Sequence, residues 1–275
     1  MNHVVNFDEQ ANCLNCGAKL TTRFCGECGQ EKARRITFKE LFKTAQRALL
    51  EFESPFLKTF ITMTTSPGRV CRNYIEGKRA SYFNPIKYAF WSLTFFIFLT
   101  ALTGQSVSEL TMSAFTSSSS PETQHFGEVL SKIIEGSMLF LTFIYAAIFA
   151  LLLRVFFRKE GIKFTEFYVL AILPSAHLTW FTSILVATSL LDAKAIGYTS
   201  LCLSIVFPIY TYTTFFKKNK IKVFLKSCTV MFLGILIVGY LSALHTHIQI
   251  GYEDAVKQHK LEQAKGEKQV ETNNL

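Results

Sequence analysis

The chain has 275 residues, 49% of them hydrophobic, and a formal net charge of +9. The hydrophobic residues are clustered in long blocks, which argues for a bilayer rather than one soluble core. Seven cysteines in a chain of this length do not indicate a disulfide scaffold. The basic charge fits either nucleic-acid binding or loops on one side of a membrane, and the positions of the charges decide between them.

Two C-x-x-C-G motifs lie near the amino terminus, at residues 13–17 and 25–29. Their spacing lets four thiolates bind one metal ion tetrahedrally, and the four candidate ligands are Cys13, Cys16, Cys25 and Cys28. The glycine after each second cysteine allows a turn that directs backbone N–H groups at sulfur. The sequence therefore predicts a zinc ribbon over residues 1–36. Structural Zn²⁺ is the expected cofactor, because protein ligands fill all four positions.

Two alternatives use the same four cysteines. A rubredoxin-like iron site has similar knuckles, normally with a longer insert between them. Two disulfides would also fit the residues, but they need an oxidising compartment. The other three cysteines, Cys71, Cys202 and Cys228, are expected to lie far from the ribbon.

Residues 37–83 are predicted to form a basic amphipathic segment. Thr37 is the expected N-cap of a first helix, whose apolar face is formed by Phe38, Leu41, Phe42, Ala45, Ala48, Leu49 and Phe52. Such a helix fits either the headgroup region of a membrane or packing on its own protein. Pro55 breaks the pattern, and the apolar stretch at 56–63 is too short to span, so we expect it to be interfacial or re-entrant.

A distinctive pattern follows, with Ser-Pro-Gly-Arg at 66–69, Tyr-Ile-Glu-Gly-Lys-Arg at 74–79 and Tyr-Phe-Asn-Pro at 82–85. Together with the paired C-x-x-C-G motifs, this pattern resembles the DUF3667 family of bacterial membrane proteins over residues 13–100. The resemblance implies the architecture, a ribbon that precedes a membrane domain. It implies no activity.

Four cations of this stretch, Arg69, Arg72, Lys78 and Arg79, are candidates for binding lipid phosphate or the carboxylates of a partner. Alternatively, they serve only to orient the chain in the membrane. Both alternatives place the cations near the bilayer surface.

Residues 84–248 are predicted to form a membrane domain, with five spans at 86–103, 137–153, 167–191, 196–216 and 223–244. The expected fold class is an all-α polytopic membrane protein with an amino-terminal zinc ribbon and a cytosolic amphipathic helical segment. The connection at 104–136 should be external, with a low-complexity run at 117–120 and a short amphipathic helix over 126–134. Residues 249–275 should form a polar, largely helical tail.

Basic residues alternate with these spans. Most of the 29 lysines and arginines fall on the amino-terminal side of the membrane. The exceptions are Lys132, Lys194, Lys257, Lys260, Lys265 and Lys268. A nucleic-acid patch would not alternate in this way, so no nucleic-acid partner is expected. We predict a multi-pass protein of the bacterial inner membrane, with a cytosolic amino terminus and an external carboxyl terminus. A reducing cytosol also favours zinc over disulfides.

His177 is the candidate functional residue within the spans. It lies in the third span, three residues after Pro174 and near Ser175 and Thr179. Such a residue can line a polar path of a transporter or channel. Alternatively, it hydrogen-bonds a backbone carbonyl that the proline leaves free.

No catalytic motif is recognisable in the sequence. It has no Walker loop, no G-x-G-x-x-G, no G-x-S-x-G and no H-E-x-x-H, and the spans hold no paired carboxylates. These absences argue against an enzyme. The preferred function is a membrane scaffold or regulator whose ribbon and basic segment bind a protein partner or anionic lipid. The alternative is a small transporter or channel with a polar path near His177.

Overall fold

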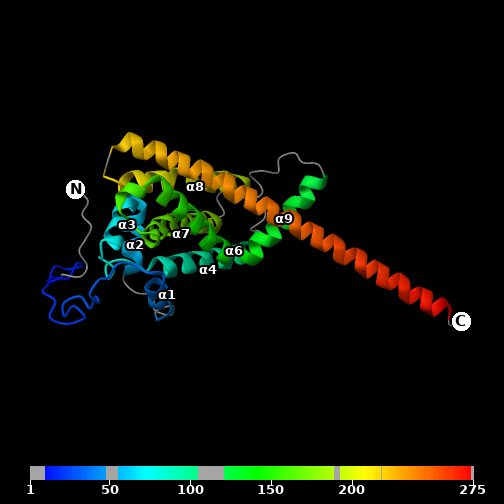
Figure 1. Ribbon diagram of the computed structural model, residues 1–275, viewed down its shortest axis with the longest axis horizontal. Coiled ribbons are helices and arrows are strands. Elements are labelled where there is room, and N and C mark those ends of the chain that lie inside the picture. Colours follow the sequence, from blue (N-terminus) through cyan, green and yellow to red (C-terminus); the bar gives the residue numbers. More distant parts are fainter. Residues whose placement is uncertain (1–9, 48–54, 105–120, 189–192, 218, 274–275) are drawn as a thin grey trace.

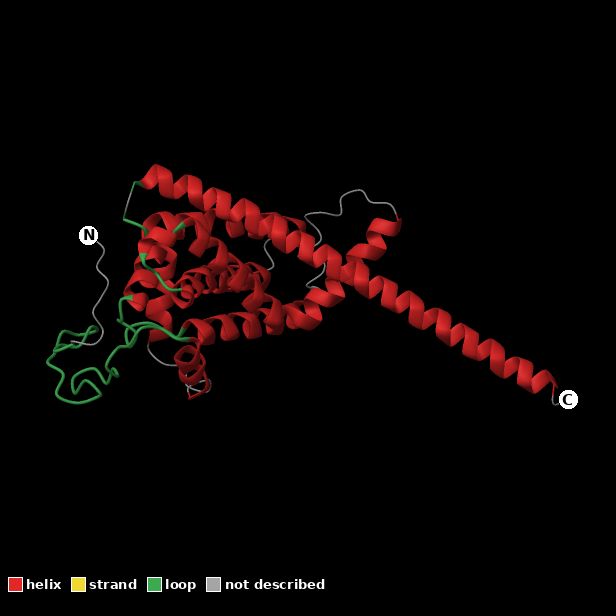
Figure 2. Ribbon diagram, in the orientation of Figure 1, coloured by secondary structure: helices red, strands yellow, loops and turns green. Residues whose placement is uncertain are grey.

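The computed structural model describes residues 10–47, 55–104, 121–188, 193–217 and 219–273. Within these residues the chain is helical apart from the amino-terminal ribbon and the connections, as Figure 2 shows, and its only β-structure is two isolated bridges. The helices are α1 (Phe38–Arg47), α2 (Pro55–Thr65), α3 (Pro67–Ile75), α4 (Pro85–Thr103), α6 (Pro121–Phe156), the short 3-10 helix η1 (Arg158–Glu160), α7 (Phe164–Thr188), α8 (Ala193–Phe215) and α9 (Lys220–Asn273). The ribbon lies at one end of the helical bundle, and α9 projects far beyond the other (Figure 1).

Helix α1 begins at the predicted cap. The Glu40 N–H donates to Thr37 Oγ1 at 3.3 Å, and the Thr37 hydroxyl lies 3.3 Å from the Glu40 carboxylate. The Thr37 side chain thus caps the helix by accepting a backbone N–H of its first turn. The next two helices, α2 and α3, each begin with a proline, whose missing N–H costs nothing in a first helical turn.

The amphipathic helix α1 packs on its own protein. Leu41 is buried, and the ring centroid of Phe38 lies 5.9 Å from that of Phe164 and 5.2 Å from that of Tyr168. Of the two alternatives for this helix, packing is therefore the one observed. Helix α2 instead exposes Leu57 and Ile61, which lie one turn apart on one face.

Helix α7 forms the centre of the bundle and contacts α4, α6 and α8. All residues from Glu166 to Pro174 are buried, so the first half of α7 is enclosed on every side. A helix that is apolar all round is typical of such a central position. Outward faces of the neighbouring helices expose large apolar side chains, including Leu102 of α4 and Phe232 of α9, as expected of surfaces that contact lipid.

Four helical segments are long and apolar enough to cross a membrane: α4, α7, Ala195–Phe215 of α8 and Lys220–Tyr252 of α9. By length and composition, the chain is therefore a membrane protein. The expected second span falls within α6, whose described apolar stretch, Phe140–Phe156, is shorter than these four. Four of the five expected spans are thus supported, and a crossing by α6 stays a prediction.

Two helices are longer than the sequence analysis predicted. The amphipathic helix expected at 126–134 is not separate, because α6 continues unbroken for 36 residues. Helix α9 likewise continues for 54 residues through most of the expected tail. Neither junction contains a proline, and a single glycine inside a helix costs only about 1 kcal/mol, which is too little to end it. Residues 48–54 and the low-complexity run at 117–120 lie outside the described residues.

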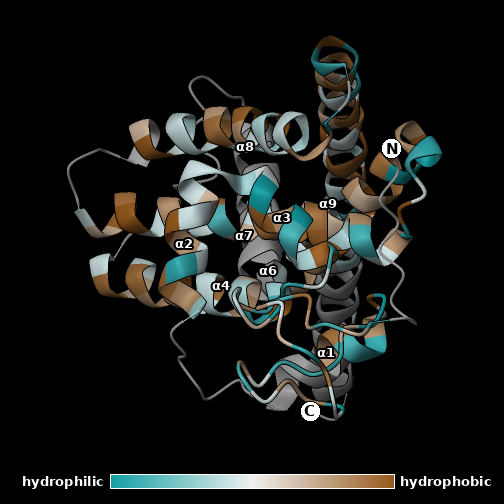
Figure 3. Ribbon diagram, turned by 90° about the vertical axis from the view of Figure 1, so that its left-hand side faces the viewer, coloured by the Kyte–Doolittle hydropathy of each residue, from teal (hydrophilic) through white to brown (hydrophobic). Residues whose placement is uncertain are grey.

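The basic connections meet at the ribbon end of the bundle. Figure 3 shows this end, with hydrophilic segments gathered around α1 and α3. The Arg35 side chain donates to the Gly161 carbonyl at 2.7 Å and pairs with Glu166 at 2.9 Å, which joins the ribbon to the α6–α7 connection. Lys226 of α9 donates to the Phe156 carbonyl at 2.8 Å. The segments before α4, between α6 and α7, and between α8 and α9 therefore lie at one end.

Candidate metal centre

The two C-x-x-C-G motifs fold into matching knuckles. The Gly17 N–H donates to the Cys13 carbonyl at 2.8 Å, and the Gly29 N–H donates to the Cys25 carbonyl at 2.9 Å. Both glycines have the predicted positive φ, 85° for Gly17 and 69° for Gly29. Side chains with a Cβ rarely adopt this conformation, which explains a glycine at the end of each knuckle. An isolated β-bridge flanks each knuckle.

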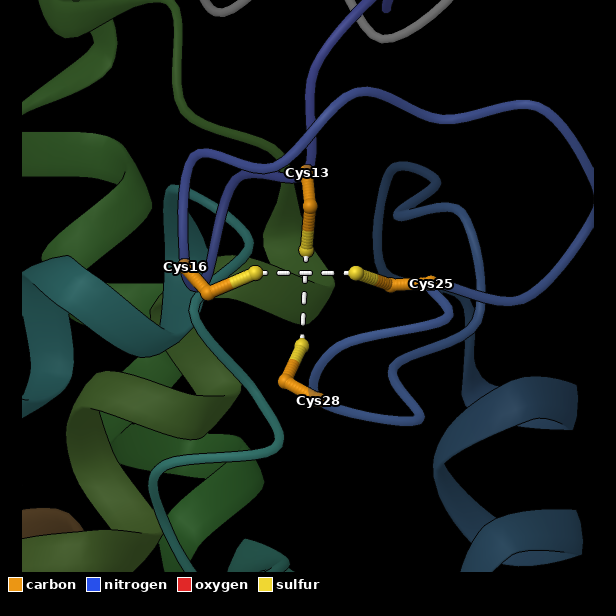
Figure 4. Close-up of side chains that lie close together, drawn as sticks. All are labelled: Cys13, Cys16, Cys25 and Cys28. Atoms are coloured by element: carbon orange, nitrogen blue, oxygen red, sulfur yellow. Dashed lines mark hydrogen bonds between the residues drawn. The ribbon is translucent and has the colours of Figure 1, made fainter.

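The four sulfur atoms converge on one point (Figure 4). The Cys13 and Cys28 sulfurs are 3.6 Å apart, the Cys16 and Cys25 sulfurs are 3.5 Å apart, and all four lie within 4.8 Å of one another. A tetrahedral metal with bonds of about 2.3 Å requires sulfurs that are roughly 3.8 Å apart. The four are free thiols at distances far beyond a disulfide bond. The cluster can therefore hold a metal ion, and its all-sulfur donor set suits zinc or iron.

Backbone N–H groups that hydrogen-bond the sulfurs act to lower the pKa of the thiols in this cluster. The Gln30 N–H lowers the pKa of the Cys28 thiol to about 7, which favours the thiolate that binds metal. The Ala18 N–H acts in the same direction on Cys16, but desolvation and the neighbouring sulfurs outweigh it and raise the pKa of Cys16 to about 12. Four crowded sulfurs cannot all ionise easily unless a cation offsets their repulsion.

The second knuckle is attached to the loop between α3 and α4 through one side chain. The buried Gln30 donates from Nε2 to the Gly77 carbonyl, and its Oε1 accepts the N–H groups of Arg79 and Ala80, each at 2.9 Å. Three of the four hydrogen bonds that a side-chain amide can make are thus directed at this loop. The metal cluster and the loop form one unit.

The first knuckle contacts the same loop. Ser81 Oγ donates to Asn15 Oδ1 at 2.7 Å. Gly77 has φ of +107°, and a Cβ at this position would lie 2.7 Å from Leu14 Cδ1. The backbone conformation therefore requires the glycine of the Gly-Lys-Arg motif, and Leu14 of the first knuckle packs into the space that a Cβ would occupy.

This loop lies inside the stretch that carried the family resemblance. Residues 53–98 match the family model described as "Protein of unknown function (DUF3667)". The resemblance to DUF3667 is confirmed over this stretch. Neither the curated proteins nor the solved structures contain a match to the chain. Residues 53–98 are called the DUF3667 segment below.

Motif residues of the DUF3667 segment join separate helices. At Gly68, a Cβ would lie 2.4 Å from the Phe215 backbone nitrogen, so only glycine permits the observed contact of α3 with α8. Asn84 caps α4, because its Oδ1 accepts the Ile86 N–H at 2.9 Å while its Nδ2 donates to the Leu41 carbonyl at 3.3 Å. The segment thus connects α1, α4, α8 and the ribbon.

The four candidate cations of the segment do not form one patch. Arg72 donates to the Thr214 carbonyl at 2.8 Å and to the Phe215 carbonyl, at the negative end of the α8 dipole. Arg79 is largely buried, and desolvation lowers its pKa. The remaining two, Arg69 and Lys78, are exposed. Only these two present their charge fully to solvent.

His177 is buried within the bundle and has a partner at each ring nitrogen. Its Nδ1 lies 2.7 Å from the Tyr88 hydroxyl, and its Nε2 lies 3.1 Å from Thr64 Oγ1. The rings of Phe60, Phe181 and Phe207 surround it, with centroids 5.1, 4.8 and 5.4 Å away. Its partners are hydroxyls on α4 and α2, not the carbonyl expected near Pro174. These contacts are those of a packing residue and give the transport alternative no support.

Two residues important to the ribbon were missed by the sequence analysis. Gln30 directly follows the second knuckle, a position where local sequence alone marks no contact. Glu166 pairs with Arg35, and it also accepts the Lys163 N–H at 2.8 Å at the start of α7. An acid directly before the predicted span at 167–191 was the one available signal for this pair.

Proposed function

We propose that this chain is a scaffold or regulator of the bacterial inner membrane, and that its ribbon end binds a protein partner or anionic lipid. The observation that carries the proposal is the attachment of the metal ribbon to the DUF3667 segment through Gln30. A ribbon fixed in this way presents a rigid surface next to the membrane domain. Its outer side exposes the aromatic ring of Phe24, a residue type enriched at protein interfaces.

Zinc is the metal we propose for the cluster, held by Cys13, Cys16, Cys25 and Cys28. When bound, Zn²⁺ supplies folding free energy to a segment too small to bury a core. All four positions are occupied by protein sulfur, so no coordination position remains for a substrate. This closed donor set supports a structural role for the metal. The folded ribbon then positions the DUF3667 segment.

The ribbon end is proposed to face the cytosol. Basic connections gather at this end, as the positive-inside rule expects of a cytosolic face. With five crossings, a reporter fused after residue 275 reads as external. A cytosolic signal there would overturn the five-span topology and the external carboxyl terminus.

Crosslinking in cells tests the proposed binding. A photoactivatable residue at the exposed position of Lys78 should recover a specific crosslinked species from the wild-type background. The species should be lost on Cys13→Ser, which removes a metal ligand, and kept on Cys202→Ser, which changes an exposed cysteine of α8. If wild type and Cys13→Ser give the same pattern, or neither gives a product, the ribbon does not serve partner binding.

A further inference from the structure

An open groove of about 440 Å³ lies between the start of α1 and the connection from α6 to α7. Its two walls are residues 36–38 and residues 162–165, and Arg154 in the last turn of α6 completes the lining. Thr165 Oγ1 donates to the Ile36 carbonyl at 2.8 Å, so a direct hydrogen bond joins the walls. The groove is therefore held in shape by the fold, as most ligand sites are.

The groove is lined by two cations, Arg154 and Lys163, and both are exposed. Among the described residues, no hydrogen bond or ion pair involves the guanidinium of Arg154 or the ammonium of Lys163. The carboxylate of Glu166, which follows the second wall, is buried and pairs with Arg35 at 2.9 Å. The charges of the two lining cations therefore remain available to a ligand.

The surroundings of the groove are basic as well. The stretches 34–40 and 154–166, which contain both walls, carry seven lysines and arginines against three glutamates. One of these glutamates, Glu40, accepts the Thr37 hydroxyl at 3.3 Å on the α1 side. The excess of cations makes the potential in the groove positive, which favours an anionic ligand.

The exposed face of α6 shows at what depth the groove lies. Four exposed apolar residues recur at helical spacing on this face: Phe140, Ile144, Leu151 and Val155. Such a stripe is typical of a surface that contacts lipid. Arg154 is exposed one turn after Leu151, at the end of the stripe. A cation in this place lies at the depth of lipid headgroups, where its long side chain can reach a phosphate.

We propose that this groove binds the phosphate of an anionic lipid headgroup, with Arg154 and Lys163 as the two cationic contacts. The proposal rests on the proposed function, because it assumes the same membrane placement and names a ligand for the ribbon end. Half-buried Ile162 and Phe164 supply an apolar wall for the glycerol part of the lipid. The α6 stripe offers a surface to acyl chains, which a soluble phosphate lacks, and this favours a lipid.

A lipid in the groove would contact two parts of the chain at once. Residues 36–38 connect the ribbon to α1, and residues 162–165 lead into α7. Phosphatidylglycerol should therefore slow hydrogen exchange in both stretches, whereas phosphatidylcholine, which has no net charge, should not. The lipid would in this way stabilise the junction between the ribbon and the membrane domain.

Native mass spectrometry of the full-length protein in detergent tests the site, with phosphatidylglycerol, phosphatidylcholine and inorganic phosphate as probes. Wild type should bind phosphatidylglycerol in preference to phosphatidylcholine. A variant with both Arg154→Gln and Lys163→Gln should bind it about tenfold or more weakly, the loss expected for even one charge-assisted hydrogen bond. The matched control combines Lys217→Gln and Lys220→Gln, which remove two exposed cations at the junction of α8 and α9, outside the groove. The control should bind as wild type does.

Each outcome decides the proposal. Equal binding by wild type and the Arg154–Lys163 variant, or equal weakening in the control, would overturn it. Equal retention of the two lipids by wild type would also overturn it, and this comparison needs no variant to fold. Displacement of the lipid by equimolar inorganic phosphate would assign the groove to a free anion, whereas resistance to a large excess would support a lipid. The proposed crosslinking at Lys78 depends on neither lining cation, so the two proposals can fail separately.

Discussion

The described residues include two polar clusters, the four cysteines of the ribbon and the surroundings of His177. They differ in whether their side chains bind one another or leave their ligand atoms directed at a common centre. The cysteine sulfurs point at a common centre and lie within 4.8 Å of one another. Both ring nitrogens of His177 are instead used by hydroxyls of the same chain, Tyr88 and Thr64. A sequence marks both clusters as unusual, one by spacing and the other by a polar residue within a span.

The difference shows what separates a ligand site from internal packing. Thiols packed this closely repel as they ionise, so a cation is needed to stabilise them together. A neutral imidazole with one donor and one acceptor partner is already satisfied and gains nothing from an added ligand. Removing a group from the first cluster should therefore abolish binding of an outside atom, and removing one from the second should change only stability.

Replacing Cys13 with Ser should have the largest effect. Serine is a poor ligand for a soft metal site, and structural zinc contributes on the order of 10 kcal/mol or more to the folding of such a ribbon. Elemental analysis of the full-length protein should find one zinc per chain in wild type and almost none in the variant. The exposed Cys202, replaced in the same way, is the control and should leave zinc content unchanged. One iron per chain in wild type would replace zinc as the proposed metal.

Replacing Gln30 with Ala should separate metal binding from attachment of the ribbon. The change removes three hydrogen bonds to the loop at 77–80, worth about 3 kcal/mol together. We expect one metal per chain as in wild type, but faster hydrogen exchange at residues 77–81. Exposed Glu27→Ala in the same knuckle is the control and should not change exchange there. Unchanged exchange in the Gln30 variant would mean that the side chain does not hold the ribbon.

Replacing His177 with Phe should lower the free energy of unfolding by less than the Cys13 and Gln30 variants do, and it should leave the metal content unchanged. The ring fits an aromatic surrounding, but the two hydroxyl contacts are lost, which should lower the free energy of unfolding by about 2 kcal/mol. Thermal unfolding in detergent measures this change, and Tyr88→Phe, which removes one of the two contacts, should cause about half of it. If the variant instead reduced flux or growth while its stability stayed unchanged, the transport alternative would be supported again.

The parts of this fold that sequence predicted are local. Two residues between cysteines and a glycine after each pair define a knuckle without help from the rest of the chain, and Thr37 caps α1 by accepting the N–H of a residue only three positions away. Long apolar blocks placed α4, α7, α8 and the first part of α9 to within a few residues, because length and hydropathy suffice for a span. The family resemblance was likewise confirmed over residues 53–98.

What sequence did not predict depends on distant pairs. Gln30 and Gly77 are 47 positions apart, and Thr64 and His177 are 113 apart. No periodicity connects such residues, since their contact is set by how separate helices cross. The same reason explains Arg72 and Arg79: a run of cations looks alike in sequence whether its members face solvent or backbone carbonyls. In the folded chain Arg72 donates to the Thr214 carbonyl at the end of α8, whereas Lys78 is exposed.

The smallest effect is expected at Lys78. Its ammonium group is exposed, so Lys78→Gln should change the free energy of unfolding by no more than about 0.5 kcal/mol. Arg72→Gln, its matched comparison in the same segment, removes the contact with the Thr214 carbonyl at the end of α8 and should cost about 1 to 2 kcal/mol. Thermal unfolding of the two variants in parallel measures the contrast. A cation already used inside the protein carries stability, whereas an exposed one is available to a partner. Equal losses in the two variants would show that the contacts of Arg72 do not set it apart from a surface lysine.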